Sequence, residues 1–136
     1  MIKSKHNKTQ IGMEFFIITA LLLFLFVIFF VAIEAHVSER NREKEEIFIK
    51  DLALSIKDEI DLATKATDGY IREFNVPENI YGKDYGITII KEGEFPNIYI
   101  NTSRNAISFP IADVEGNIIK GTNTIRKENG TVYLNE

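Results

Sequence analysis

The chain has 136 residues and a formal net charge of −4, from 16 basic and 20 acidic side chains. It contains no cysteine, which excludes a disulfide framework and thiolate chemistry. Its two histidines stand on opposite sides of a long apolar run, which argues against a histidine-based metal site or catalytic triad. No phosphate loop, nucleophile motif or pair of carboxylates marks a site, so we predict no enzyme, no metal and no cofactor.

A basic leader, residues 1–9, precedes an apolar segment that we assign to residues 10–34. The leader has three lysines and no acid, and the acidic remainder of the chain argues against nucleic-acid binding. Residues 15–33 form an uncharged run of nineteen residues, which as a helix would span about 28 Å of a bilayer. No A-x-A-like cleavage site follows the run. The positive-inside rule therefore predicts a transmembrane helix with its N-terminus in the cytoplasm and the remaining chain outside.

An amphipathic helix is expected to continue the apolar one over residues 35–69. Residues 38–68 contain no proline or glycine, and apolar residues recur there at steps of three and four. This stripe consists of Ile49, Leu52, Ile56, Ile60 and Ala63. With Gly69 as the natural C-cap, we expect one nearly continuous helix from about residue 10 to about residue 68.

A β-rich head, residues 70–136, is expected after the helix. Its short runs lie at residues 85–90, 97–100, 106–112, 117–121, 122–128 and 131–134. Asn129 and Gly130 predict a hairpin with a type I′ turn, and Pro110 predicts an edge strand or a bulge. The fold class is therefore predicted as α+β, a long N-terminal α-helix packed by a small antiparallel β-sheet head.

Glu14 is a lone acid at the start of the apolar run, and it has two interpretations. It can mark the membrane boundary, or it can belong to a motif with Gln10, four residues before it. Residues 8–16, KTQIGMEFF, resemble an archaeal class III signal peptide, the leader type of type IV pilin-like proteins. In that family a prepilin peptidase cuts before the apolar segment. The resemblance therefore implies cleavage between Thr9 and Gln10.

The resemblance also implies a function as a structural subunit. Gln10 would become the first residue of the mature chain, and its free amine would pair with Glu14 of an adjacent subunit. The precursor would lie in the cytoplasmic membrane with its head outside, and the mature subunits would assemble into an extracellular adhesive filament. Thr9 stands where the family has Gly or Ala, which favours an alternative: an uncleaved single-pass protein displaying a small β binding domain outside the cell.

Two N-x-[ST] triplets outside the predicted membrane span begin at Asn101 and Asn129, and both are candidate N-glycosylation sites. Asn129 has the additional role in the predicted turn. Other polar clusters have simpler interpretations. Asp58, Glu59 and Asp61 fit a solvated helix face better than a metal site, and residues 113–117 lack the spacing of a calcium loop. A tethered enzyme is the least favoured of the three functions.

Overall fold

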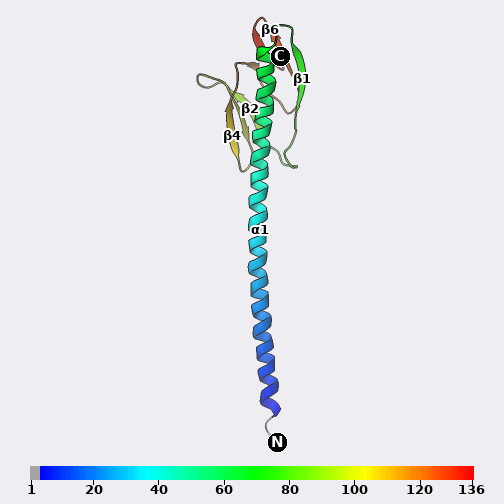
Figure 1. The fold of residues 1–136 in the computed structure, drawn as a ribbon, viewed down its shortest axis with the longest axis vertical. Coiled ribbons are helices and arrows are strands. Elements are labelled where there is room, and N and C mark those ends of the chain that lie inside the picture. Colours follow the sequence, from blue (N-terminus) through cyan, green and yellow to red (C-terminus); the bar gives the residue numbers. More distant parts are fainter. Residues whose placement is uncertain (1–3) are drawn as a thin grey trace. The chain divides into compact units, whose positions relative to one another are not determined.

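The computed structural model describes the backbone of residues 4–136 and the side chains of residues 11–136. Within these residues one helix precedes seven strands. Figure 1 shows their arrangement. They are α1 (Ser4–Lys65), β1 (Ile71–Val76), β2 (Gly86–Ile90), β3 (Asn97–Asn101), β4 (Ala106–Pro110), β5 (Glu115–Gly116), β6 (Gly121–Glu128) and β7 (Thr131–Leu134). The predicted α+β class is confirmed. The chain divides into two compact units, and we call the second, Arg42–Glu136, the head unit.

Helix α1 is continuous for 62 residues. It begins at Ser4 rather than near residue 10, because no proline interrupts the leader, and it ends at Lys65 rather than near residue 68. The chain leaves the helix there, and Gly69 adopts a φ of +92°, a conformation that favours glycine. Lys127 of β6 completes this end of the helix. Its Nζ donates to the carbonyl oxygens of Thr64 and Ala66 at 2.6 and 2.9 Å. An ammonium at this position satisfies free carbonyls and complements the helix dipole.

The strands form two sheets rather than the single antiparallel sheet that was expected. One is four-stranded, in the order β1-β6-β7-β5, and the other is three-stranded, in the order β2-β3-β4. The four-stranded sheet is mixed, because β5 pairs with β7 in parallel while the other pairs are antiparallel. Strand β4 is an edge strand, as Pro110 predicts. Asn129 and Gly130 have φ of 51° and 79°, which confirms the predicted type of turn.

Strand β1 was missed by the sequence analysis, whose first expected run in the head begins at residue 85. Its residues are mostly exposed and show no apolar alternation, so no local pattern marks it as a strand. Its conformation comes from pairing with β6, from Ile71 opposite Arg126 to Val76 opposite Gly121. A partner some fifty residues away therefore decides its structure.

The core of the head unit is built on the predicted helix stripe. The five stripe residues named above are between 0% and 9% exposed. They pack with apolar residues from both sheets, such as Ile98 and Ile100 of β3, Ile125 of β6, and Val132 and Leu134 of β7. Figure 1 shows β2 and β4 on one side of the helix and β1 on the other. The prediction that the β-rich head packs on the helix is confirmed, and the helix stripe forms one side of the core.

The strand expected at residues 117–121 does not form, and a buried asparagine of β6 binds the backbone of this segment. Asn123 is 0% exposed, and its Oδ1 accepts hydrogen bonds from the Ile119 N–H at 2.9 Å and from Asn135 Nδ2 at 2.7 Å. Its Nδ2 donates to the carbonyl oxygens of Ile119 and Gly121. The amide thus makes all four of its hydrogen bonds. Residues 117–120 form no ladder, Ile119 is bound by this side chain instead, and the short β5 pairs at this edge.

Candidate functional site

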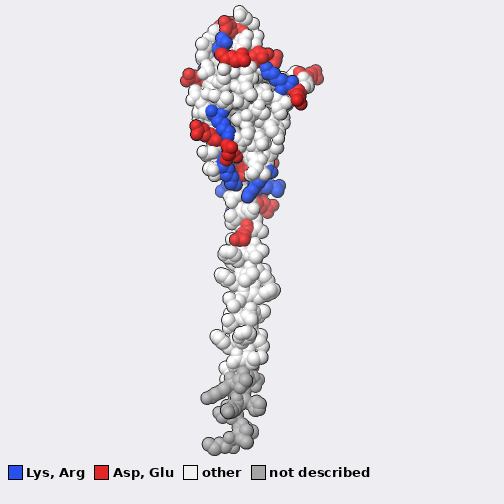
Figure 2. Space-filling view, turned by 180° about the vertical axis from the view of Figure 1, so that it is seen from behind, with Lys and Arg blue, Asp and Glu red and all other residues white. Residues whose placement is uncertain are grey.

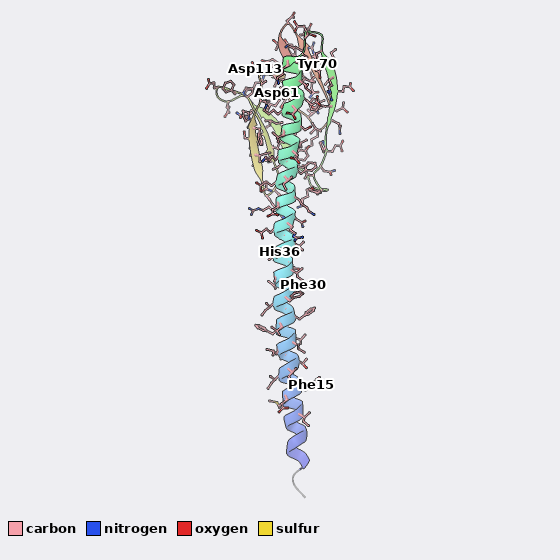
Figure 3. All side chains as sticks on the ribbon, viewed as in Figure 1. Phe15, Phe30, His36, Asp61, Tyr70 and Asp113 are labelled. Carbon is pink, nitrogen blue, oxygen red and sulfur yellow. The ribbon has the colours of Figure 1, made fainter. Side chains whose placement is uncertain are left out.

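The apolar segment of α1 carries the largest exposed apolar surface in the described part of the chain. The large apolar side chains of residues 15–33 are between 45% and 71% exposed. By its length and composition this helix can cross a membrane. Figure 2 shows the segment free of charged side chains on the face presented, and Figure 3 shows Phe15 and Phe30 pointing away from the helix. A surface of this kind requires cover by lipid or by other protein.

The uncharged part of this segment, residues 15–33, contains no side chain that needs a hydrogen-bond partner from outside the helix. Thr19 is the one polar residue of this uncharged run, and its hydroxyl donates to the carbonyl oxygen of Phe15 at 2.8 Å. This bond within the helix allows the hydroxyl to enter lipid or a protein interface without a further partner. Glu14, which directly precedes the segment and is exposed, is therefore the group whose charge must be accommodated if the segment is buried.

The predicted processing site, between Thr9 and Gln10, directly precedes the first residue whose side chain the structure describes. Thr9 and Gln10 belong to α1 by their backbone, while their side chains lie outside the described residues. Residues four apart on a helix lie on the same face, one turn from each other, so Gln10 and Glu14 share a face of α1. The pairing between Gln10 of one subunit and Glu14 of the next involves two chains and stays a prediction.

The two predicted glycosylation asparagines lie on the surface of the head unit in different settings. Asn129 is exposed in the two-residue turn between β6 and β7. Asn101 is exposed at the end of β3, opposite Gly86 of β2. Its Oδ1 lies where a side chain at position 86 would stand, so that position has room only for glycine while the Asn101 side chain keeps this conformation. A shallow polar depression, lined in part by Asp84 and Ser103, adjoins Asn101.

Glu45 is a buried carboxylate that the sequence analysis did not identify. It is 4% exposed, and its Oε2 lies 3.7 Å from Lys83 Nζ, in the turn where Ile80 and Lys83 form a β-bridge. Its Oε1 has no hydrogen-bond partner among the described residues. The signal was present, because Glu45 stands four residues before Ile49 and therefore continues the inward stripe. One carboxylate beside one lysine fixes the Ile80–Lys83 turn to the helix and forms no catalytic pair.

Lys120 forms a small charged cluster at the surface of the head unit. Its ammonium pairs with the Asp84 carboxylate and lies 4.7 Å from the centre of the Tyr85 ring. The hydrogen bond and the charge of Lys120 lower the pKa of Asp84 below its ordinary value of 3.8. Burial raises the pKa of Tyr85, whose hydroxyl donates to the carbonyl oxygen of Pro77. The cluster ties the loop before β2 to the segment before β6.

The side chains of residues 11–136 give little support for a metal site. No group of three or more metal-ligating side chains occurs among them. Asp58 is exposed on α1, and Asp61 is bound by Lys57 at 2.5 Å. Comparison with family models, with curated proteins and with solved structures gave no match. The functional argument therefore rests on the chain's own residues.

Proposed function

We propose that this chain is a type IV pilin-like structural subunit, cut by a prepilin peptidase before Gln10 and assembled through its apolar segment into an extracellular filament. One observation carries the proposal: a continuous helix joins an exposed apolar segment, directly preceded by Gln10 and Glu14, to a folded head. A membrane anchor alone needs no carboxylate at that position. A filament subunit needs one, because a charged group can favour one axial register among otherwise identical contacts between apolar helices.

The physical argument concerns the charge of Glu14. In the precursor the carboxylate can stay hydrated at the membrane surface. In a bundle of apolar helices it would be buried, at a cost of about 2.5–3.5 kcal/mol on membrane-insertion scales. Cleavage before Gln10 creates an α-ammonium that can pair with Glu14 of the adjacent subunit. A buried polar pair of this kind favours one register over the others, as polar residues in coiled-coil seams do.

The N-terminal peptide tests the processing step. Mass spectrometry is applied to protein from its own membranes and to the fraction sheared from the cell surface. A chain that begins at Gln10 supports the proposal. Pyroglutamate in that position would support the cleavage, but it lacks the α-ammonium and would require a different partner for Glu14. A chain that begins at Met1 in both fractions overturns it and favours an uncleaved, membrane-anchored protein that displays its head.

The Glu14→Ala variant tests the role of the charge in assembly. We expect normal membrane insertion and cleavage, with little protein in the sheared fraction, because each subunit contact loses its charge pair. A loss of 1.4 kcal/mol per contact lowers the association constant about tenfold. Glu34→Ala removes the acid just beyond the other end of the apolar run and serves as the matched control, which should assemble normally. Normal filaments from the Glu14 variant would contradict the charge-pair account.

A further inference from the structure

The face of α1 opposite the core of the head unit carries three exposed apolar residues. Ile47, Leu54 and Leu62 are 59%, 37% and 49% exposed. Each stands two residues from a core residue, which are Ile49, Ile56 and Ile60. Two residues span more than half a turn of a helix, so the exposed and buried sets lie on opposite faces. The exposed three are seven and eight residues apart, which places them on one stripe along the helix.

Charged residues alternate with these apolar residues along the same stripe. They are Lys44, Asp51, Asp58 and Lys65. All four are exposed, and none takes part in an ion pair or a side-chain hydrogen bond within residues 11–136. We call the three apolar and four charged residues together the outer seam. The seam lies entirely within the head unit, and its charges are available to a partner.

The order of charges along the outer seam discriminates between arrangements of two copies. A parallel pair in register would bring Lys44, Asp51, Asp58 and Lys65 each against its own copy, with like charges at every charged level. An antiparallel pair would set Lys44 against Lys65 and Asp51 against Asp58, again like against like. Both arrangements are therefore disfavoured, since like charges that face each other between helices are destabilising.

A parallel pair displaced by seven residues, about 10 Å along the axis, matches the seam to itself. Lys44 of one copy then faces Asp51 of the other, and Asp58 faces Lys65. Between these levels, Ile47 of one copy faces Leu54 of the other. Leu54 of the first copy faces Asp61 of the other, which is the residue before Leu62. The unfavourable levels are Asp51 against Asp58 and Leu54 against Asp61. The arrangement thus combines two levels of opposite charge with one apolar level.

A displacement of two heptads is the remaining competitor. It also sets opposite charges together, Lys44 with Asp58 and Asp51 with Lys65. It leaves Ile47 facing Asp61 and Leu54 facing Asp68 of the other copy, so it retains no apolar level. Because an apolar contact contributes more than an exposed ion pair, the one-heptad displacement is favoured.

We infer that the outer seam binds the outer seam of a second copy of this chain, parallel and displaced by one heptad, with Ile47 of one copy against Leu54 of the other. This inference rests on the proposed function, in which all copies leave one membrane with the same polarity. It adds a contact between the amphipathic halves of the helices, separate from the apolar segment and from Glu14.

Disulfide trapping tests the register, because the chain has no cysteine of its own. Full-length Ile47→Cys and Leu54→Cys chains with different tags are expressed together and oxidised in the sheared fraction and in membranes. Both sites are exposed, so the substitutions leave the core intact. We expect mixed dimers of the two tagged chains to exceed both homodimers. A Glu92→Cys chain, altered on the exposed loop between β2 and β3, gives the background of random collision.

Charge reversal supplies an independent readout. Lys44→Glu combined with Lys65→Glu removes both opposite-charge levels, and we expect about a fivefold loss of mixed dimers. The matched control is Lys50→Glu, which reverses an exposed lysine outside the seam on the same helix and should leave the yield unchanged.

The outcomes separate this inference from the proposed function. Filaments that contain mixed dimers uphold both. Filaments with homodimers, with trapping between Ile47→Cys and Leu62→Cys, or with no trapping above background overturn the seam and leave the filament standing. Mixed dimers in membranes, from chains that still begin at Met1 and form no filaments, uphold the seam and overturn the proposed function.

Discussion

Replacing Ile60 by alanine tests the dependence of the head unit on the helix. Ile60 is 0% exposed and belongs to the core that α1 shares with both sheets. The substitution removes three methylene-sized groups, which corresponds to about 2.4 kcal/mol of lost transfer free energy. Incomplete collapse of the cavity adds to this value, and measured costs of such changes are about 2–5 kcal/mol. Folded domains are stable by only about 5–15 kcal/mol, so the loss is a large fraction of the total.

The matched control is Ile47→Ala, the same exchange on the outer face of the same helix. Ile47 is 59% exposed, so we expect a change within about 0.5 kcal/mol. Both variants are compared as detergent-dispersed monomers, in which the outer seam has no partner. The helix backbone is equally altered in the two, so their difference isolates the packing of the core.

Tyrosine signals make the assay specific for the head unit. All five tyrosines lie beyond residue 69, and the chain has no tryptophan. Near-ultraviolet circular dichroism at 275–285 nm, followed through thermal unfolding, therefore reports the head. A loss of about 4 kcal/mol corresponds to a decrease in Tm of about 15–30 °C for a domain of this size. Equal and small decreases for the two variants would refute the conclusion that the helix stripe is half of the core.

Three further changes have defined expectations. Lys127→Met should cost about 1–2 kcal/mol, because the carbonyl oxygens at the end of α1 lose a charged donor, and the same unfolding assay measures the loss. Asn123→Leu should cost about 3 kcal/mol or more, because its buried backbone partners become unsatisfied; a neutral result would mean that water replaces the amide. Lys120→Gln should raise the NMR titration midpoint of the Asp84 carboxyl, since the lysine lowers its pKa. A carboxyl with a lowered folded pKa stabilises the fold above its unfolded pKa near 3.8, and this contribution is lost as the pH falls through the folded pKa.

Features that repeat along neighbouring residues were predictable from the sequence. The apolar run, the continuous helix and the inward stripe each depend on a period within a few turns of one element. The turn at Asn129 and Gly130 was predictable for the same reason, because a two-residue turn depends on the conformations that those two residues tolerate. The candidate site at Thr9, Gln10 and Glu14 also came from local order, so it could be located by sequence and still awaits its test.

Features that depend on distant partners required the tertiary structure. Strand β1 has little apolar pattern and is a strand because β6 supplies its hydrogen bonds. Nothing in the local sequence marks Asn123 as a buried residue. Its amide is buried because Asn135 and the backbone of Ile119 form hydrogen bonds with it. The pairing of Glu45 with Lys83 likewise joins residues far apart in the chain, although the inward position of Glu45 follows from the helix stripe.

The sequence by itself determined which face of α1 is apolar and which segments can pair, because these follow from the side chains of one element. The tertiary structure alone decided that the strands divide into two sheets and that Ile47, Leu54 and Leu62 stay uncovered. An apolar residue on a helix is buried only if some other element reaches it. The sheets of this chain cover the inner stripe and leave the outer seam for a partner.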